Sequence, residues 1–256
     1  MEDFFKLLLS NWWGITAIVV VSIIFLVGVS ALLYKPFFKR FYDILLSSIA
    51  IIVLSPIFLL LIIIGAIKMK GNPFFVQQRP GKKGKIFKLI KFRTMTLEKD
   101  EHGELLPDEK RLTKYGQVLR STSLDELPEL FNIFIGNMSI VGPRPQLVRD
   151  MVFMSEKVKT RHSVRPGLTG LAQVNGRNNL TWTQKFEYDL EYISKISLFE
   201  DIKIILQTVG KVLKRSDTVR EGTVSDIDYG DWLLKENLIS KEEYNEKQKI
   251  TKELLK

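Results

Sequence analysis

Two adjacent carboxylates, Asp125 and Glu126, lie in the stretch LRSTSLDELPEL, residues 119–130. Ser123 and Glu126 have the S-x-x-E spacing of a capping box, and Pro128 fits a first helical turn, so the pair can simply begin a helix. A helix start also attracts anions, and an aspartate there keeps a low pKa. Such an aspartate would be charged and available as a nucleophile. The spacing leaves both interpretations open.

A rigid turn with one arginine follows, because SIVGPRPQ places Arg144 between Pro143 and Pro145. A guanidinium held in this way suits phosphate oxygens. The chain has no cysteine and only two histidines, His102 and His162, which excludes thiol nucleophiles, disulfides and histidine-rich metal sites. It also has no glycine-rich phosphate loop and no GxSxG motif. Any phosphate must therefore be bound by side chains, helix ends and a metal.

The chain is basic, with 38 Lys and Arg against 29 Asp and Glu and a net charge of +9. The segment from Lys68 to Leu97 contains nine Lys and Arg and no acidic residue. Such a surface attracts the phosphates of nucleotides, lipid headgroups or nucleic acid. One alternative function is therefore a membrane-tethered basic adaptor that binds anionic lipid or nucleic acid without catalysis. That alternative leaves the two carboxylates and Arg144 unused.

An uncharged apolar segment, Asn11–Tyr34, predicts a transmembrane helix. At about 1.5 Å per residue it reaches roughly 36 Å, enough for a hydrocarbon core of about 30 Å. Trp12, Trp13 and Tyr34 lie at its ends, as interfacial anchors do. A cleaved signal peptide is the alternative, but the run is too long and no basic region precedes it.

A second apolar segment, Ile44–Ile67, contains Pro56 near its midpoint. Proline removes a backbone donor and costs about 3 kcal/mol in a helix, although Ser55 can bond to a freed carbonyl. Lysine and arginine flank the segment on both sides, and cationic flanks favour the cytoplasmic face. We therefore predict a re-entrant hairpin rather than a kinked helix that spans the membrane.

The remaining segments predict a mostly helical domain. Aromatic and β-branched residues on both sides of a Pro-Gly turn predict a β-hairpin over residues 73–92. The polar segment 96–116 that follows predicts a loop with short helical turns. A helical stripe of apolar residues favours core packing, with a helix lying flat on the membrane as the alternative. The stripe consists of Leu198, Ile202, Ile205, Val209 and Val212. Helix starts with the spacing of a capping box are Thr181 with Gln184, Ser197 with Glu200, and Ser240 with Glu243.

The predicted fold class is a mainly α membrane protein. It has one N-terminal transmembrane helix, a proline-broken re-entrant membrane helix, and a cytoplasmic α-rich domain with a small β-hairpin. The predicted domains are the N-terminal helix (1–38), the re-entrant helix (39–70), the catalytic domain (71–216) and a charged C-terminal tail (217–256).

The segment RSTSLDELPELFNIFIGNMSIVGPRP resembles the signature of the bacterial sugar transferase family. These monotopic polyprenyl-phosphate phosphoglycosyl transferases start capsule, exopolysaccharide and glycan assembly. FFVQQRPGKKGKIFKLIKFRTM precedes the signature and VRPGLTGLAQVNGRNNLTWTQKFEYDLEYISKISLFEDIKIILQTV follows it, so the resemblance covers about residues 39–215. The family's Ser-Pro break in a re-entrant helix corresponds to Ser55 and Pro56.

The resemblance implies a two-step transfer. Asp125 would attack the β-phosphate of a UDP-sugar, expel UMP and hold the sugar phosphate, which polyprenyl (undecaprenyl) phosphate would then accept. Glu126 would share Mg²⁺ with Asp125 or relay a proton, and the sequence leaves both roles open. Positions that match phosphate-binding sites of the family are Arg120, Arg144, Lys91, Arg93 and Arg177. Other matching motif positions are Pro143, Pro145 and Asp189.

The resemblance also places the protein in the bacterial plasma (inner) membrane, with its catalytic domain on the cytoplasmic face and no nucleic-acid partner. One departure is Glu129, where the family more commonly has Gln. It adds a negative charge near the pair and leaves the metal arrangement open. The sequence does not identify the sugar, the polyprenyl length or the oligomeric state, a homodimer included.

Overall fold

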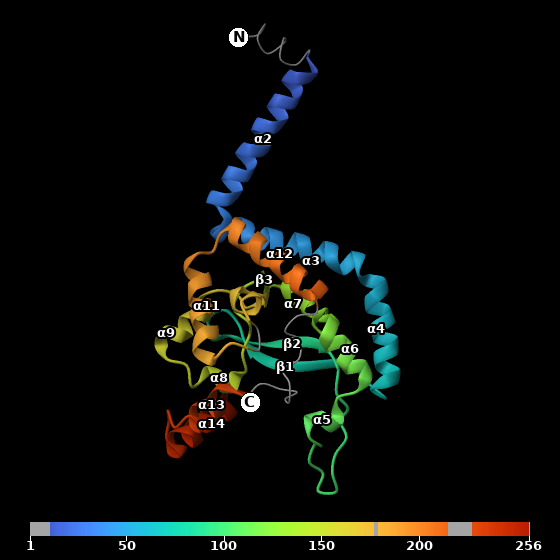
Figure 1. Ribbon diagram of the computed structural model, residues 1–256, viewed down its shortest axis with the longest axis vertical. Coiled ribbons are helices and arrows are strands. Elements are labelled where there is room, and N and C mark those ends of the chain that lie inside the picture. The colour runs from blue at the N-terminus through green and yellow to red at the C-terminus, as the bar shows by residue number, and fades with distance from the viewer. Residues whose placement is uncertain (1–10, 177–178, 215–226, 256) are drawn as a thin grey trace.

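The computed structural model describes residues 11–176, 179–214 and 227–255. Its first helix, α2 (Trp12–Leu32), projects away from the rest of the molecule (Figure 1). By length and composition α2 is able to cross a membrane, as the sequence predicts. A short π-helix, η1 (Tyr34–Phe38), joins it to the main body.

The second apolar segment forms two helices, α3 (Lys39–Val53) and α4 (Ser55–Lys68), which meet at an angle of 63°. The break lies at the predicted Ser-Pro position. As expected, the Ser55 hydroxyl donates a hydrogen bond to the Ile52 carbonyl, at 2.8 Å. Since Pro56 has no amide hydrogen, this bond helps to satisfy the backbone where the helix is interrupted.

Two small sheets position the later loops. The predicted hairpin is confirmed as β1 (Phe74–Pro80) and β2 (Ile86–Phe92), which pair antiparallel around a short 3₁₀ turn, η2 (Lys82–Gly84). The sequence did not predict the second sheet, in which β3 (Ser139–Val141) pairs parallel with β4 (Gly167–Thr169). Its strands are too short to show an alternating pattern.

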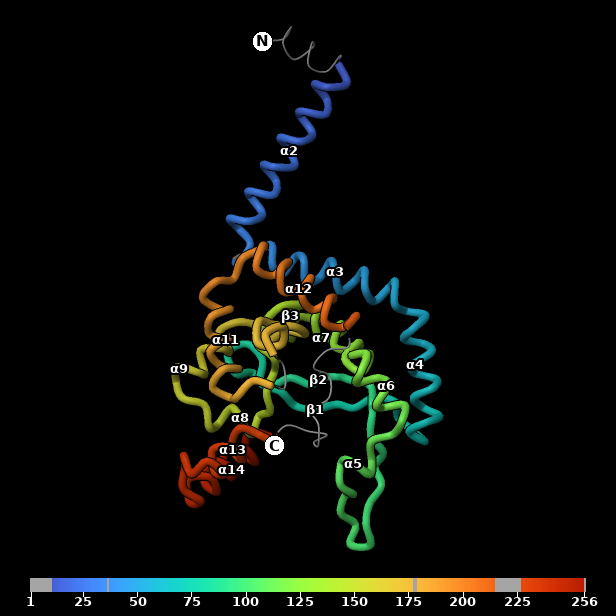
Figure 2. Tube along the Cα trace, viewed as in Figure 1, coloured from blue at the N-terminus to red at the C-terminus, as the bar shows by residue number. Residues whose placement is uncertain are grey.

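Helices enclose these sheets (Figures 1 and 2). Between β2 and β3 lie α5 (Asp108–Arg111), α6 (Lys114–Thr122), the 3₁₀ turn η3 (Leu124–Glu126) and α7 (Glu129–Ile135). Between β3 and β4 lie α8 (Val148–Met151), α9 (Glu156–Lys159) and the 3₁₀ turn η4 (Thr160–Ser163). After β4 come α10 (Leu171–Val174), α11 (Trp182–Ser194), α12 (Leu198–Lys214), α13 (Tyr229–Lys235) and α14 (Lys241–Leu254).

The predicted helix starts are present. Thr181 and Gln184 form a reciprocal capping box at the start of α11. The hydroxyls of Ser197 and Ser240 accept hydrogen bonds from the backbone amides three residues later, at 3.2 and 3.1 Å. These contacts satisfy amides that a helix leaves free at its first turn, so local sequence determines where these helices begin.

The bent helix pair is part of the core of the main body. Phe58 and Leu61 of α4 pack in one cluster with Phe92, Leu119 and Ile133. Both arms of the pair are also hydrogen-bonded to this body, because Arg40 donates to the Ile133 carbonyl at 2.6 Å and Tyr115 donates to the Leu61 carbonyl at 3.1 Å. The pair is therefore fixed to the domain near the start of α3 and in the middle of α4.

The apolar stripe predicted on α12 is only partly buried. Ile205 packs against the second core cluster, as core packing predicts, but Ile202 and Val209 are exposed, so that prediction is wrong for them. The fully buried residue is Ile204, which the stripe omits. The helix is rotated in this way because Asp201 lies one turn before Ile204 and is itself buried among hydrogen-bond donors. The exposed face carries Phe199, Ile202, Leu206, Val209 and Leu213.

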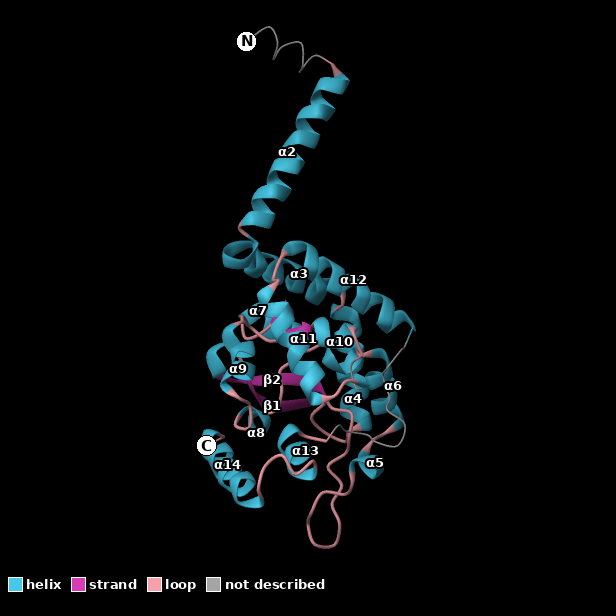
Figure 3. Ribbon diagram, turned by 60° about the vertical axis from the view of Figure 1, so that its left-hand side comes forward, coloured by secondary structure: helices cyan, strands magenta, loops and turns pink. Residues whose placement is uncertain are grey.

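The described C-terminal residues fold back onto the body at the end opposite α2 (Figures 1 and 3). The Tyr229 amide donates to Asp150 at 2.8 Å, and Phe153 stacks on Tyr244 with ring centroids 5.6 Å apart. Residues 227–255 thus pack against α8.

Candidate active site

The two carboxylates lie on η3, not in the first turn of α7. Ser123 has a left-handed backbone, with φ of 57°, and ends α6. Its side chain does not cap η3, and Glu126 is engaged elsewhere, so the predicted capping box is wrong. A non-glycine residue in this conformation costs about 1–3 kcal/mol, which the surrounding structure must compensate. The turn directs both acids toward β2 and the loop after β3.

Glu126 is held by two cations from distant parts of the chain. Its Oε1 accepts hydrogen bonds from Lys91 Nζ at 2.7 Å and from Arg144 Nη2 at 2.9 Å. Lys91 Nζ also lies 3.1 Å from Oε1 of the buried Glu129. Burial opposes ionisation of Glu126, but Lys91 and Arg144 outweigh it and hold the pKa of this carboxyl well below its usual range. Glu126 is therefore an ionised, immobilised group.

Asp125 differs from its neighbour. No ion pair or hydrogen bond engages its carboxylate among the described residues. Burial, and then the charge of Glu126, raise the pKa of Asp125 to about 6, although Lys91, Arg120 and Arg144 act in the opposite direction. The low pKa predicted from a helix start is therefore wrong, because the residue lies on a half-buried 3₁₀ turn beside a second acid. At neutral pH Asp125 is still mostly ionised, and its oxygens are available.

The other residues predicted to bind phosphate lie at different distances from the carboxylate pair. Arg120 donates to Thr94 at 3.1 Å and lies close enough to Asp125 for each to shift the pKa of the other. Arg93 donates to the Phe74 carbonyl at 3.3 Å, at the open end of the hairpin. Arg177 lies outside the described residues. The structure thus brings Lys91, Arg120 and Arg144 to the carboxylate pair.

A buried ion pair supports the turn that carries Arg144. Arg161 is paired with Asp189 at 2.6 and 2.9 Å, and both side chains are almost fully buried. Arg161 also donates to the Arg144 carbonyl at 2.6 Å, while Arg79 donates to the Pro145 carbonyl at 3.1 Å. Asp189, predicted as a motif position, therefore acts on the site through Arg161. Sequence reasoning missed Arg79 and Arg161.

Comparison with known proteins decides the family. The model of the family described as "Bacterial sugar transferase" matches residues 34–215, more than half of the chain. The chain belongs to the bacterial sugar transferase family. It is accordingly an enzyme, a phosphoglycosyl transferase.

Individual relatives agree with this assignment. The uncharacterized sugar transferase EpsL of Bacillus subtilis is 48% identical over 175 residues, which cover 68% of this chain and 87% of the relative. The UDP-glucose:undecaprenyl-phosphate glucose-1-phosphate transferase of Klebsiella pneumoniae is 46% identical over 186 residues, covering 68% of this chain but only 40% of the relative. The exopolysaccharide production protein ExoY of Rhizobium meliloti is 37% identical over 191 residues, covering 68% and 84%.

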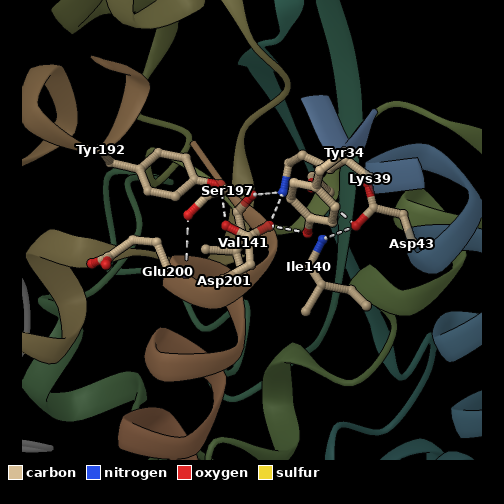
Figure 4. A network of polar contacts seen from close by, with 10 residues as sticks. Tyr34, Lys39, Asp43, Ile140, Val141, Tyr192, Ser197, Glu200 and Asp201 are labelled. Carbon is tan, nitrogen blue, oxygen red and sulfur yellow. Dashed lines mark hydrogen bonds and ion pairs between the residues drawn. The ribbon is translucent and has the colours of Figure 1, made fainter. Parts of the chain in front are cut away.

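In this transferase, a second buried polar cluster fixes β3, which leads into the Arg144 turn (Figure 4). We call it the β3 network, and it comprises Tyr34, Lys39, Asp43, Tyr192 and Asp201. Asp43 accepts hydrogen bonds from the Ser139 hydroxyl at 3.0 Å and from the Ile140 amide at 2.9 Å.

The β3 network continues at the last residue of the strand. The Val141 carbonyl accepts hydrogen bonds from Lys39 at 3.0 Å and from Tyr192 at 3.1 Å. Asp201 in turn accepts from Tyr34, Lys39 and Tyr192 (Figure 4). Helices α3, α11 and α12 and the segment after α2 therefore converge on a strand that ends three residues before Arg144.

The donor set of the transferase fits a magnesium ion. No group of three or more His, Cys, Asp or Glu that could hold a metal occurs in the described parts of the chain. Mg²⁺ is commonly bound by one or two carboxylates, with water and substrate phosphates as its other ligands. Asp125 and Glu126 provide two adjacent carboxylates, and burial and then the charge of Glu126 raise the pKa of Asp125, so a bound cation would favour its ionised form.

Proposed function

We propose that this transferase moves a sugar-1-phosphate from a UDP-sugar to undecaprenyl phosphate and releases UMP, through a covalent intermediate on Asp125. The observation that carries the proposal is the contrast between the two acids. Glu126 is held by Lys91 and Arg144, whereas the Asp125 carboxylate has no such partner among the described residues and is still mostly ionised at neutral pH. The names of the Klebsiella pneumoniae and Xanthomonas campestris relatives support the donor and acceptor classes.

In the first step an Asp125 oxygen forms a bond to the β-phosphorus of the donor. The bond from that phosphorus to the oxygen bridging to the α-phosphate breaks, and UMP leaves with the bridging oxygen. In the second step a phosphate oxygen of the lipid attacks the same phosphorus. The bond to Asp125 then breaks, which restores the carboxylate and yields a polyprenyl-diphosphate sugar.

The cations around Asp125 and Glu126 reduce the electrostatic repulsion between a carboxylate and the donor phosphate. A carboxylate that approaches a phosphate anion to 4 Å meets about 4 kcal/mol of repulsion per unit charge pair at an effective dielectric constant of about 20. That repulsion would cost nearly a thousandfold in rate. Arg120 and Arg144 place positive charge beside Asp125, and Lys91 and Arg144 neutralise Glu126. Bound Mg²⁺, held by Asp125 and Glu126, would neutralise phosphate charge further.

The same contacts argue against a basic adaptor. We call Asp125, Glu126 and Glu129 the carboxylate cluster. Lys91, part of the basic segment, points into it, where it neutralises Glu126 at 2.7 Å and contacts Glu129 at 3.1 Å. The names of exopolysaccharide production proteins among the relatives support a role in exopolysaccharide, capsule or glycan synthesis. The sugar remains open, because the relatives include transferases named for glucose and for galactose.

The decisive experiment omits the lipid. Purified enzyme is mixed with a UDP-sugar and Mg²⁺, and UMP and the intact protein mass are measured together. We expect one equivalent of UMP at most and a mass increase equal to one sugar phosphate, both absent from Asp125→Asn. If the wild-type enzyme released UMP only after undecaprenyl phosphate was added and never gained mass, the covalent mechanism would be wrong.

We also propose that α3 and α4 form a re-entrant hairpin at the cytoplasmic face of the bacterial plasma membrane. Cationic flanks on both sides support it, and so does the attachment of both arms to one domain. Because the chain has no native cysteine, single cysteines at Lys35 and Lys68 can be labelled in inverted and right-side-out vesicles. Both should react with an impermeant reagent from the cytoplasmic side only. Labelling from opposite sides would indicate a spanning helix.

A further inference from the structure

The C-terminal residues 227–255 lie beyond the part of the chain that matches the family model, yet they pack beside the proline-flanked turn. Arg149 of α8, the helix that follows this turn, forms an ion pair with Asp228. The Trp182 indole of α11 donates a hydrogen bond to the Ile227 carbonyl at 3.2 Å. The segment is therefore docked on two helices that adjoin the turn.

The first connection to the turn is the carboxylate of Asp150, which is only 1% exposed. One of its oxygens accepts from the Tyr229 amide at 2.8 Å, and the other accepts from the Leu147 amide, just after the turn, at 3.2 Å. Its charge also stabilises the buried guanidinium of Arg79, which donates to the Pro145 carbonyl. An oxygen that lost its amide would be buried without a partner, which favours a shift of the whole side chain.

The second connection is the ring of Tyr229. It packs edge-on against the buried ring of Phe186, with centroids 4.9 Å apart and planes at 87°. The Arg161 guanidinium lies over the same Phe186 ring, 5.8 Å from its centroid, and donates to the Arg144 carbonyl at 2.6 Å. Tyr229 thus contacts both supports of the turn, because its amide binds Asp150 and its ring packs on Phe186.

We propose that Tyr229 is a positioning residue, which holds the proline-flanked turn so that Arg144 meets the donor phosphate. We call Tyr229 with Asp150 and Phe186 the C-terminal clamp. The inference rests on the proposed function, in which Arg144 binds phosphate, and adds a distant part of the chain to that site. A displacement of about 1 Å in a binding group can cost about a hundredfold in rate, so a residue that touches no substrate still affects the reaction.

Three variants of Tyr229 separate the two connections. Tyr229→Phe keeps the amide and the ring and removes the hydroxyl, which makes no hydrogen bond within the part of the chain that the structure describes. Tyr229→Ala keeps the amide and removes the ring. Tyr229→Pro removes both. Proline suits the first position of α13, and Asp228 already has the extended backbone, with ψ of 157°, that a following proline requires.

The kinetic readout is the KM for the UDP-sugar, measured by UMP release with undecaprenyl phosphate present. We expect Tyr229→Pro to raise this KM by at least about fivefold, Tyr229→Ala to raise it by a smaller factor, and Tyr229→Phe to match the wild type. KM does not depend on the fraction of enzyme that is folded. A purely structural role would therefore lower the melting temperature and leave KM unchanged.

Combination with Arg144→Ala identifies the residue through which the clamp acts. Tyr229→Pro should raise the donor KM in the wild-type background and have no further effect when Arg144 is already alanine. An equal increase in both backgrounds would show that Tyr229 does not act through Arg144 and would overturn the proposal.

Hydrogen exchange tests the clamp without activity. The Leu147 amide should exchange faster in Tyr229→Pro than in Tyr229→Phe, whereas the amides that pair β1 with β2 should stay equally protected. Unchanged exchange at Leu147, or an unchanged donor KM, would overturn the proposal. If Tyr229→Pro does not fold, as judged by its melting temperature, Tyr229→Ala takes its place in both measurements.

Other outcomes separate this proposal from the proposed function. A raised donor KM in Arg144→Ala but not in Tyr229→Pro would overturn the clamp and leave the proposed function untouched. If the wild-type enzyme released no UMP without lipid, the covalent mechanism would be wrong, but the KM comparison, made with lipid present, would still test the clamp. If the enzyme used no UDP-sugar at all, hydrogen exchange at Leu147 would still decide whether the clamp holds the turn.

Discussion

Two buried charge clusters in this transferase are built in opposite ways. In the β3 network, Asp201 accepts hydrogen bonds from Tyr34, Lys39 and Tyr192, so its charge is fully compensated. In the carboxylate cluster, Glu126 is compensated in the same manner, but its neighbour Asp125 is not. A satisfied network stabilises one arrangement of its elements, whereas a buried charge without a partner is typical of a reactive site.

The two clusters are connected, since β3 belongs to the first and leads directly into the second. The β3 network fixes the strand at Ile140 and Val141, and the chain then reaches Arg144, which binds Glu126. The β3 network thus helps to determine where Arg144 lies, the arginine that we propose binds phosphate. Changes in the β3 network should therefore reduce stability, and changes in the carboxylate cluster should reduce activity.

The largest effect is expected for Asp125→Asn, which tests the reactive half of the comparison. Loss of the nucleophile should reduce steady-state turnover by at least about a thousandfold, as for nucleophiles of other covalent enzymes. Because the side chain keeps its shape and loses an unfavourable buried charge, the melting temperature should be unchanged or higher. Turnover by UMP release and thermal unfolding in detergent measure the two quantities. Near-normal turnover in a folded variant would contradict the assignment.

Asp201→Asn tests the structural half. Removing this charge leaves Lys39 without its buried counter-ion, which typically costs about 3–5 kcal/mol. The melting temperature should therefore fall markedly, while folded molecules retain the donor-only UMP release. A stable variant without that activity would mean that the network takes part in the chemistry.

Arg144→Ala should have the next largest effect. Its side chain is 43% exposed and binds Glu126, so its loss removes a donor for phosphate with little loss of packing. A charge-assisted hydrogen bond is worth about 1.5–3 kcal/mol, which predicts an increase of roughly ten- to hundredfold in the KM for the UDP-sugar. The melting temperature should change little. Unchanged kinetics would make the proline-flanked turn purely structural.

Glu129→Gln should have the smallest effect, a change in melting temperature that depends on pH. Burial raises the pKa of Glu129 to about 7, above the value of 4.5 for the free side chain, despite the opposing charge of Lys91. A raised pKa means that its contribution to stability is complete below about pH 4.5 and is lost as the pH rises through about 7. Glu129→Gln has no carboxyl group at this position to ionise, so it does not lose this stability as the pH rises. Its melting temperature, relative to the wild type, should therefore be higher at about pH 8 than at about pH 5, and a constant difference would contradict this.

Local chemistry made much of the fold predictable. The Pro-Gly turn between aromatic residues predicted β1 and β2, Ser55 and Pro56 predicted the break, and Thr181 with Gln184 predicted the start of α11. In each case the decisive interaction joins residues close in sequence. The family signature also singled out Asp125, Glu126 and Arg144, which the structure brings together.

Long-range packing accounts for what the sequence did not predict. Arg161 and Asp189 are 28 residues apart, and Tyr34 and Asp201 are 167 apart, so no local spacing indicates either pair. The low pKa predicted for Asp125 failed for the same reason. Its value depends on burial and on the neighbouring Glu126, whereas the prediction considered only a helix start.

The attachment of α2, α3 and α4 to the main body has a consequence for how the enzyme would meet the proposed lipid acceptor. Tyr34 bonds to Asp201, Arg40 to the Ile133 carbonyl, and the Leu61 carbonyl to Tyr115, so the chain is fastened to the catalytic body at three separated points. A domain attached by one flexible linker would change its distance from the bilayer and its orientation. With the proposed hairpin in the membrane, this domain would be held at a constant height and tilt, so the phosphate of a lipid acceptor would meet Asp125 at the same depth each time.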